Sequence, residues 1–303
     1  MIKLHSVKLL TLLFLVLCSY RCQKKEPLIL ATYTYSTNDR IDNLLPLSKD
    51  LEKQLNRKVE VRSYPDVPSF IRGIKAKEVD IALINTLGYL ILSTDNDVMH
   101  PIATLKVTEN AVDNYKSVLL GNTDSITDLK DLVGQVENLR MTFVAQGSTS
   151  GNLMPRLLLS SLGIKNPEAD FESVSYGGDH TKTFNKLLSN ETDIAAIGSS
   201  EFYKQIASKP GADSLKVLWL SDEIPLGPVL LNNDLADTDR EKISKVFLTL
   251  HQKAPHSLEA VKNGWSEAKQ TDRFYQIDDG YYQNFRTLKG NSTDLPNILK
   301  SFE

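Results

Sequence analysis

From residue 28 onward, short apolar runs alternate with amphipathic segments along the chain. Residues 28–32 and 59–64 have the apolar or alternating pattern of strands. Between them, leucines recur at spacings of three and four, which predicts an amphipathic helix over 43–56. A helix over 68–77, which opens with Pro and Ser, and a buried strand over 79–84 continue the pattern. This βαβαβ order is typical of a mainly parallel sheet covered by helices, with a ligand site at the carboxyl ends of the strands.

The same alternation returns in the middle of the chain. Its expected elements are strands at 140–144, 171–174, 192–197 and 216–220, and helices at about 151–162 and 180–189. A Pro-rich turn follows at 224–228, and the rest of the chain is expected to be largely helical. The sequence therefore predicts a second α/β unit of the same kind.

An internal similarity links the two units. Residues 71–82 and 184–195 each combine a helical pattern, a short polar turn and then Asp-Ile-Ala. Two similar α/β lobes are the simplest explanation. We interpret Asp80 and Asp193 as turn or strand-start residues rather than catalysts, because Asp commonly accepts hydrogen bonds from nearby backbone N–H groups.

The first 22 residues differ from the rest of the chain. Lys3 and Lys8 precede a continuous apolar run over 9–17, and no acidic residue appears before Glu26. A membrane-spanning helix needs about 20 apolar residues, whereas an export signal needs only a short run after a basic start. Residues 1–22 are therefore predicted to be a signal peptide and are left out of the expected fold.

Both cysteines of the chain, Cys18 and Cys22, lie at the end of this segment. Residues 23–303 contain none, which excludes a thiol enzyme or a disulfide scaffold. The position looks like a lipoprotein processing site, with Cys22 favoured over Cys18 because a polar stretch follows it. A plain secretory signal with incidental cysteines is the alternative.

Composition and charge narrow the class of protein further. With 41% hydrophobic and 24% charged residues, the chain has an ordinary globular balance, and its 303 residues suit two lobes. Residues 1–22 contain three basic and no acidic side chains, so their removal changes the net charge from −3 to −6. No basic stripe is present, which makes nucleic acid an unsuitable partner.

The loop Gly147-Ser148-Thr149-Ser150-Gly151 connects a predicted strand to a predicted helix. Such a loop places hydroxyl groups and unpaired backbone N–H groups at the positive end of a helix dipole, which favours a phosphate-like or carboxylate anion. Ordinary N-capping by one Ser or Thr is the alternative. His180 also begins a predicted helix, and its imidazole could donate to the same oxyanion or serve as a cap or surface residue.

Enzymatic interpretations have little support in the sequence. Thr149 stands at the centre of the Gly-x-x-x-Gly loop, where a hydrolase has its nucleophilic Ser, and no His partner can be assigned. The five histidines form no pair at helical metal-ligand spacing, and no phosphate-cradling Gly-x-x-x-x-Gly-Lys motif is present. We therefore expect no catalysis, no metal and no cofactor.

Taken in order, four blocks of sequence resemble the phosphate/phosphite/phosphonate-binding proteins of bacterial ABC importers, over about 28–270. The blocks are Asp66 to Ala82, the Gly-Ser-Thr-Ser-Gly loop followed by Pro155, the stretch from Gly177-Gly178-Asp179-His180 to Asp193-Ile194-Ala195, and Ile224-Pro225-x-x-Pro228. The resemblance implies the two-lobed periplasmic binding-protein type II fold, with a ligand cleft at the hinge. Lobe 1 would comprise 27–120 plus 222–303, and lobe 2 would comprise 121–221.

The resemblance also implies where the ligand binds. In that family the Ser-Thr-Ser run and the His hydrogen-bond the phosphonate oxygens, which transfers to Ser148, Thr149, Ser150 and His180. The anion would lie on the helix start that includes Gly151.

Other positions depart from the family pattern. Val67 replaces a Tyr of the aminophosphonate-binding members, and Leu83-Ile84 replaces an aromatic pair. Gly227 stands where those members carry the carboxylate that holds the ligand's amino group. A further family Glu corresponds to Ser200 or to Glu201.

Loss of the amine-binding carboxylate disfavours an aminoalkylphosphonate, because a buried ammonium without a partner is costly. Phosphate, phosphite or a simple alkylphosphonate are the expected ligands. The possible replacement contacts from lobe 1 are Tyr33, Thr34, Tyr35 and Tyr89.

The resemblance implies a transport role. A monomeric, exported and lipid-anchored protein would close on its oxyanion, and an ABC permease would recognise the closed form. A sensor module or lipoprotein that signals to a membrane receptor remains the alternative.

Overall fold

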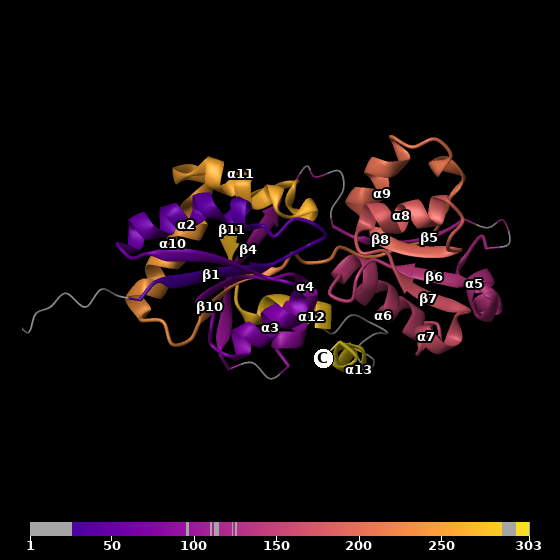
Figure 1. Cartoon of the computed structure of the whole chain (residues 1–303), viewed down its shortest axis with the longest axis horizontal. Coiled ribbons are helices and arrows are strands. Elements are labelled where there is room, and N and C mark those ends of the chain that lie inside the picture. The colour runs from indigo at the N-terminus through magenta and orange to yellow at the C-terminus, as the bar shows by residue number, and fades with distance from the viewer. Residues whose placement is uncertain are drawn as a thin grey trace, which may run out of the picture.

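The computed structural model describes residues 26–302 except 95–96, 110, 112–114, 123, 125 and 287–294. The predicted signal peptide and both cysteines, Cys18 and Cys22, lie outside the described residues. Figure 1 shows two α/β lobes side by side, each built around its own sheet. Across the described part of the chain, none of the helices combines the length and apolar character that a bilayer span requires.

Lobe 1 is built on a six-stranded sheet in the order β11-β4-β10-β3-β1-β2. The strands are β1 (Leu28–Tyr33), β2 (Val59–Tyr64), β3 (Ile81–Leu83), β4 (Met99–Val107), β10 (Pro228–Asn232) and β11 (Thr271–Gln276). One face packs against α2 (Ile41–Leu55), α10 (Asp237–Lys253) and α11 (Pro255–Asn263). The other face packs against α3 (Val67–Lys75) and α4 (Thr86–Leu92). Lobe 1 thus has a hydrophobic core on each side of its sheet.

Lobe 2 is built on a five-stranded sheet in the order β7-β6-β8-β5-β9. The strands are β5 (Ser117–Gly121), β6 (Arg140–Phe143), β7 (Ser173–Tyr176), β8 (Ile194–Gly198) and β9 (Lys216–Leu220). Helices α8 (His180–Leu188) and α9 (Ser199–Ile206) lie on one face, whereas α5 (Leu129–Gln135), α6 (Met154–Ser161) and α7 (Pro167–Asp170) lie on the other. The helices α12 (Gln283–Arg286) and α13 (Leu295–Lys300) end the described chain, and α13 contacts α4 and α6.

The α/β class is confirmed, but the prediction of mainly parallel sheets needs correction. Strand β1 pairs in parallel with β2 and β3, whereas β10 is antiparallel to both β3 and β4. In lobe 2, β6 is parallel to its neighbours and β5 is antiparallel to its own. The chain crosses between the lobes twice, after β4 and after β9. Strands β5 and β10 enter their sheets from the end that faces the other lobe, where the parallel strands finish, and therefore run in the opposite direction.

The expectation of a largely helical chain after residue 228 is correct, since α10, α11, α12 and α13 all lie in this region, but it missed two strands. Strand β10 lies at the centre of the lobe 1 sheet and β11 forms its edge. The apolar run of β10 is too short for its pattern to separate a buried strand from a buried helix.

The boundary between the lobes also differs from the prediction. Strand β5 pairs in the lobe 2 sheet, although the predicted boundary at 120/121 falls within this strand.

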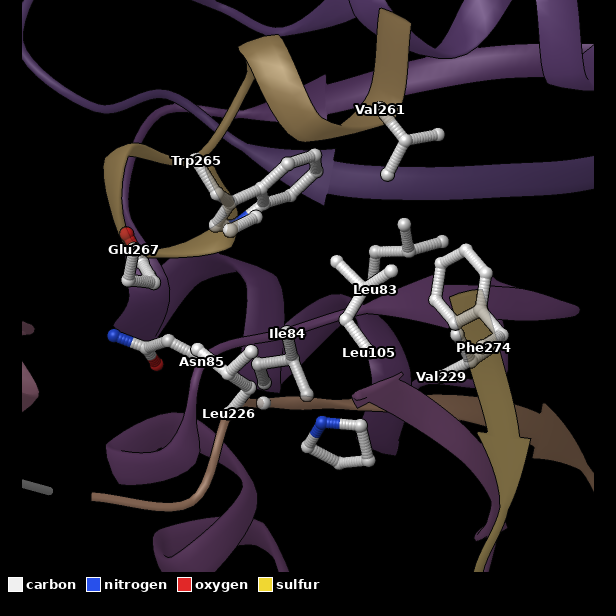
Figure 2. A pocket seen from close by; sticks show the side chains of 13 residues that line it. Leu83, Ile84, Asn85, Leu105, Leu226, Val229, Val261, Trp265, Glu267 and Phe274 are labelled. Carbon is white, nitrogen blue, oxygen red and sulfur yellow. The ribbon is translucent and has the colours of Figure 1, made fainter. Parts of the chain in front are cut away.

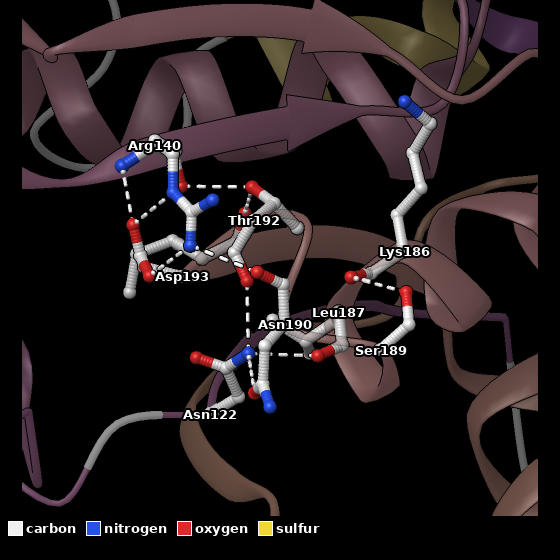
Figure 3. A network of polar contacts seen from close by, with 9 residues as sticks. Asn122, Arg140, Lys186, Leu187, Ser189, Asn190, Thr192 and Asp193 are labelled. Carbon is white, nitrogen blue, oxygen red and sulfur yellow. Dashed lines mark hydrogen bonds and ion pairs between the residues drawn. The ribbon is translucent and has the colours of Figure 1, made fainter.

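Both aspartates of the internal similarity accept a hydrogen bond from the backbone of a neighbouring strand, which agrees with their interpretation as strand-start residues. Asp80 accepts a hydrogen bond from the Ile29 backbone N–H at 2.7 Å. Asp193 accepts the equivalent bond from the Arg140 N–H at 2.8 Å and also binds the Arg140 guanidinium. Figure 3 shows this ion pair together with Asn122, whose amide donates to the turn before β8.

Candidate functional site

A cavity of about 340 Å³ lies between the two lobes. Lobe 1 contributes residues from the loop after β1, the start of α3, Asn85 before α4, and the segment 263–269. Lobe 2 contributes the loop after β6 and His180 at the start of α8. Tyr115 lies on the segment that connects the lobes. The cavity therefore has walls from both halves of the protein, at the carboxyl ends of the parallel strands.

The Gly-Ser-Thr-Ser-Gly loop forms the lobe 2 wall. The chain makes one π-helical turn over Thr149–Leu153 and then continues as α6. The Ser148 hydroxyl caps this turn by accepting the Gly151 N–H at 3.0 Å. A Cβ at Gly151 would lie 2.3 Å from the Val144 side chain, so the close turn requires glycine there. Since the Ser148 oxygen already accepts a bond, its own O–H is available to donate into the cavity.

Ser150 lies directly behind this wall. Its side chain is fully buried, and its hydroxyl has no hydrogen-bond partner among the described residues. The Tyr115 phenol lies near it without the geometry of a hydrogen bond. A Cβ added to Gly198 would approach both the Ser150 Oγ, at 3.1 Å, and the His180 ring, at 3.5 Å. A buried polar group without a partner is costly, so the Ser150 hydroxyl is a candidate hydrogen-bond donor to a ligand.

His180 is held as a neutral hydrogen-bond donor. Its Nδ1 accepts the Gly198 backbone N–H at 3.0 Å, which leaves the proton of the neutral ring on Nε2. Burial lowers the pKa of His180 to about 4, although the charges of Glu201 and Asp179 partly offset this effect. The imidazole is therefore uncharged at neutral pH, and its free Nε2–H can donate to an oxyanion.

Arg40 supplies a positive charge from lobe 1. Its guanidinium lies 4.5 Å from the centre of the Tyr33 ring and 4.4 Å from that of Trp265. The side chain is only 3% exposed and donates from Nε to the Gly264 carbonyl at 2.8 Å. Within the described ranges, no carboxylate forms an ion pair with it. The buried guanidinium adds positive charge to a cavity whose lining also includes the carboxylates of Asp66 and Glu267.

Hydrogen bonds between the lobes close the cavity. The Asn85 side chain donates to the Gly147 carbonyl at 2.7 Å, and the Leu87 N–H donates to the Thr149 hydroxyl at 3.0 Å. The His180 N–H donates to the Tyr35 hydroxyl at 3.2 Å. Because these bonds join residues of different lobes, the structure corresponds to a closed form.

The structure brings together only part of the predicted site. Among the described residues, the predicted positions that line the cavity are Thr34, Tyr35, Ser148, Thr149 and His180, together with Tyr33. Ser150 and Gly151 lie just behind the wall. Glu201 accepts a hydrogen bond from Thr181 at 2.6 Å and, like Ser200, does not line the cavity.

Tyr89 lies in the core of lobe 1, away from the cavity. Its ring is fully buried, and its hydroxyl donates to Asp279 at 2.7 Å. Helix α4 turns this side chain toward α12 and Tyr282, whose ring centre lies 4.6 Å away. The sequence did not show which face of α4 points to the cavity.

At Gly227, where the resemblance places the family carboxylate, the structure leaves no room for a side chain. A Cβ at this position would lie 1.9 Å from the Ile84 carbonyl oxygen. The two backbones pack so closely that no other side chain fits.

Sequence reasoning missed four charged residues of the cavity, namely Arg40, Asp66, Glu267 and Lys269. Arg40 follows the first strand, Asp66 precedes α3, and the other two come from the far end of the chain. No motif marks Arg40, Glu267 or Lys269, because only the packing of the 263–269 segment beside the loop after β1 brings them together.

A small apolar pocket of about 40 Å³ lies inside lobe 1 next to the cavity. Figure 2 shows Leu83, Leu105 and Phe274 on its apolar side, with Asn85 and Glu267 on the opposite side. Asn85 and Glu267 also line the main cavity. The two spaces therefore meet at this pair of polar side chains.

Two α/β lobes, joined by two connections and closed over a cavity that is lined by hydrogen-bond donors, define a two-lobed solute-binding protein of the periplasmic type. A family model described as "ABC transporter, phosphonate, periplasmic substrate-binding protein" matches residues 30–282. The chain belongs to this family, which confirms the resemblance found in the sequence.

Curated relatives support the assignment. The chain is 25% identical over 249 residues to the phosphonates-binding periplasmic protein of Escherichia coli, an alignment that spans 81% of this chain and 72% of that one. It is 28% identical over 213 residues to the phosphate-import protein PhnD of Mycolicibacterium smegmatis, with coverage of 67% and 64%.

Solved structures confirm the predicted fold. PhnD1 from Prochlorococcus marinus, solved in complex with methylphosphonate, superposes with a TM-score of 0.69 and 21% identity, covering 91% of this chain and 98% of that one. A binding protein component of an ABC phosphonate transporter from Pseudomonas aeruginosa gives a TM-score of 0.67 and 21% identity, with coverage of 91% and 95%. The family is one of solute-binding components of importers, which places this chain in a periplasmic transport role.

Proposed function

We propose that this protein captures a phosphorus oxyanion, namely phosphate, phosphite or a simple phosphonate, in the cavity between its lobes and delivers it to an ABC importer. The buried Ser150 hydroxyl, which lacks a partner beside His180 and Gly198, is the observation that carries this proposal. The names of the relatives, which refer to phosphonates, phosphate and phosphite, support the ligand class.

The donors around this point suit an oxyanion. The hydroxyls of Ser148, Thr149 and Ser150 and the Nε2–H of His180 are the proposed ligands of the phosphorus oxygens. All of them are neutral, so they hold an anion through directed hydrogen bonds without placing another net charge in the protein. The guanidinium of Arg40 supplies the long-range attraction from lobe 1.

Side chains of lobe 1 complete the enclosure. Tyr35 and Thr34 are the proposed contacts on the opposite wall, since both line the cavity. Tyr89 is left out because its hydroxyl is already bound to Asp279. Ser200 and Glu201 act, in this proposal, only through α9 and the charge that Glu201 places near His180.

Ligand capture proceeds by closure of the two lobes. We assign residues 27–116 plus 222–303 to lobe 1 and 117–221 to lobe 2, because β5 pairs in the second sheet. The bonds from Asn85 and Leu87 to the 147–149 loop hold the closed form, which the permease would recognise.

The proposal extends to export and anchoring. Residues 1–22 would direct secretion, and Cys22 or Cys18 would carry a lipid that keeps the monomeric protein at the membrane. Mass spectrometry of the mature protein tests this assignment. A lipid-modified N-terminal Cys supports it, whereas a cleaved chain without lipid supports a plain secretory signal.

The binding proposal is tested by calorimetry and thermal unfolding of residues 23–303 with phosphate, phosphite, methylphosphonate and sulfate. A ligand at 100 times its Kd adds about 2.7 kcal/mol of stability. Ser150→Ala and His180→Ala are expected to weaken binding about tenfold or more, since each removes a donor to a charged group. Ser161→Ala, at the exposed end of α6, is the matched control. Binding of another solute class, or equal affinity in all variants, would contradict the proposal.

A further inference from the structure

Glu267 places a carboxylate in the wall of the cavity. It lies on a 3₁₀ turn, Ser266–Ala268, at the end of the segment after α11. Its side chain lines the main cavity and also the apolar pocket beside it, opposite the apolar residues in Figure 2. A carboxylate in this position is unexpected for a site that receives an anion.

The Glu267 carboxylate is not neutralised by the protein. In the part of the chain that the structure describes, its only hydrogen bond comes from the Ser266 hydroxyl to Oε2 at 3.3 Å, and it forms no ion pair. Oε1 is left without a donor within the same residues. The group is half-buried, so water only partly satisfies it.

Glu267 lies close to the oxyanion donors. Its negative charge contributes to the raised pKa values of Tyr33, Tyr35 and Tyr115, all of which line the cavity. Tyr115 also lies beside Ser150. The carboxylate and the unpartnered Ser150 hydroxyl therefore lie near the same phenol.

A fully deprotonated oxyanion on these donors would be repelled by the nearby carboxylate. The conflict disappears if the ligand turns a proton-bearing group toward Glu267. We infer that Glu267 is a specificity residue that accepts a hydrogen bond from a protonated group of the ligand and disfavours ligands that lack one. This inference rests on the proposed function of the cavity.

Two sources can provide this proton. One is the P–OH group of a singly protonated phosphorus oxyanion. The other is an ammonium at the end of a short tail that reaches toward the apolar pocket. In both cases the shared chemistry is a donor that pairs with a carboxylate, which makes a strong, charge-assisted hydrogen bond.

The remaining charges around Glu267 do not replace this donor. Arg40 is held by backbone carbonyls and aromatic rings, and Lys269 is exposed. From α3, Asp66 lines the same cavity as a second carboxylate, and from α8, His180 is neutral above pH about 4. None of these described groups donates a hydrogen bond to Glu267 Oε1, so a protonated group of the ligand can take that position.

Calorimetry of the mature protein with methylphosphonate, between about pH 5.5 and about pH 8.5, tests the inference. The wild-type affinity is expected to fall about tenfold as the ligand loses its second proton. Glu267→Gln keeps the shape and removes the charge, so the variant should bind the singly protonated ligand more weakly and the doubly charged ligand more tightly than the wild type.

A second titration with 2-aminoethylphosphonate separates the two proton sources. If the ammonium is the donor, Glu267→Gln loses about tenfold in affinity for this ligand at neutral pH, whereas its affinity for methylphosphonate, which has no ammonium, does not fall at any pH. If the P–OH group is the donor, both ligands show the same pH-dependent change.

Glu259→Gln, on the exposed side of α11, removes one negative charge outside the cavity and should leave both affinities unchanged. Equal affinities of Glu267→Gln and the wild type for both ligands over the whole pH range would overturn the inference. If the wild type binds neither of these ligands, nor phosphate or phosphite, the proposed function of the cavity fails instead. The two failures are therefore distinguishable.

Discussion

Lobe 1 and lobe 2 contain the same backbone unit just before a central strand. In each, a helix ends at a residue with a left-handed backbone, Lys77 with φ 60° and Asn190 with φ 61°. The next N–H bonds back to the helix, from Glu78 to the Gly73 carbonyl and from Glu191 to the Lys186 carbonyl. A left-handed residue followed by such a bond is the Schellman motif, which is a common way to end a helix.

The aspartates that follow are also equivalent in position. Asp80 and Asp193 each exchange hydrogen bonds with one residue of the neighbouring strand. An asparagine from the antiparallel strand then donates to the residue before each aspartate, from Asn232 to the Val79 carbonyl and from Asn122 to the Thr192 carbonyl.

The two units differ at one partner. The residue bonded to Asp80 is Ile29, whereas the residue bonded to Asp193 is Arg140. Burial raises the pKa of Asp80, while hydrogen bonds from the Arg140 guanidinium lower the pKa of Asp193. In the same backbone arrangement, burial therefore destabilises the ionised carboxylate of Asp80, whereas hydrogen bonds stabilise that of Asp193. The difference comes from a side chain on another strand.

Removal of the Asp193 carboxylate should have the largest effect. Asp193→Ala leaves the Arg140 backbone N–H and its guanidinium without their acceptor, and we expect a loss of about 3 kcal/mol in the free energy of unfolding. Urea denaturation measures this loss. A loss below about 1 kcal/mol would mean that water replaces the carboxylate.

The matching change in lobe 1 should cost about half as much. Asp80→Ala removes only the acceptor of the Ile29 N–H, for which we expect about 1.5 kcal/mol by the same measurement. If Asp80→Ala costs as much as Asp193→Ala, the guanidinium of Arg140 adds nothing to the lobe 2 unit.

Arg140→Ile, which gives lobe 2 the residue type that lobe 1 has at this position, should reduce the free energy of unfolding less than either aspartate substitution. Arg140→Ile removes the ion pair but keeps the backbone hydrogen bond to Asp193, and the pair is partly exposed. We expect a loss of about 1 kcal/mol. The same variant should raise the pKa of Asp193, which can be followed by NMR titration of its carboxyl carbon. An unchanged pKa would show that the backbone N–H alone lowers it.

The pH dependence of stability should have opposite signs at the two sites. Because the folded pKa of Asp193 lies below its unfolded value of about 3.9, its contribution is complete above that pH and is lost as the pH falls through the folded pKa. The folded pKa of Asp80 is raised, so its ionisation opposes folding as the pH rises from about 3.9 through the folded value.

Denaturation of Asp193→Asn and Asp80→Asn between about pH 3 and pH 7 separates these effects. The free energy of unfolding of the wild type relative to Asp193→Asn should fall on acidification. Relative to Asp80→Asn, it should rise. Parallel curves for the two variants would contradict the comparison.

The smallest expected effect concerns ligand binding. Neither Arg140 nor Asp193 lines the cavity, so Arg140→Ile should bind methylphosphonate with unchanged affinity. Calorimetry at neutral pH tests this expectation. A change of about tenfold would connect the lobe 2 unit to the oxyanion loop through β6.

Local signals in the sequence predicted the units of this fold well. The helix expected at 43–56 is observed as α2, and the helix expected at 180–189 as α8. The Asp-Ile-Ala similarity correctly predicted two related turns. These features depend on spacing within one segment, which the side-chain pattern records directly.

The residues that line the cavity were predicted where they belong to a recognisable local motif and were missed where only the packing of distant segments brings them there. Ser148, Thr149 and His180 line the cavity because loops at the carboxyl ends of neighbouring strands converge. Tyr89 lies in the core instead, because the packing of a short helix decided its direction.

The sequence by itself determined the α/β class, the helix and turn units and the hydroxyl loop, because each follows from residue types at fixed local spacing. Only the tertiary structure decided the direction of β5 and β10, the meeting of Arg40 and Glu267 at one cavity, and the opposite pKa shifts of Asp80 and Asp193. Each of these depends on groups far apart in the chain, whose approach is set by how the two lobes pack and by the burial that follows.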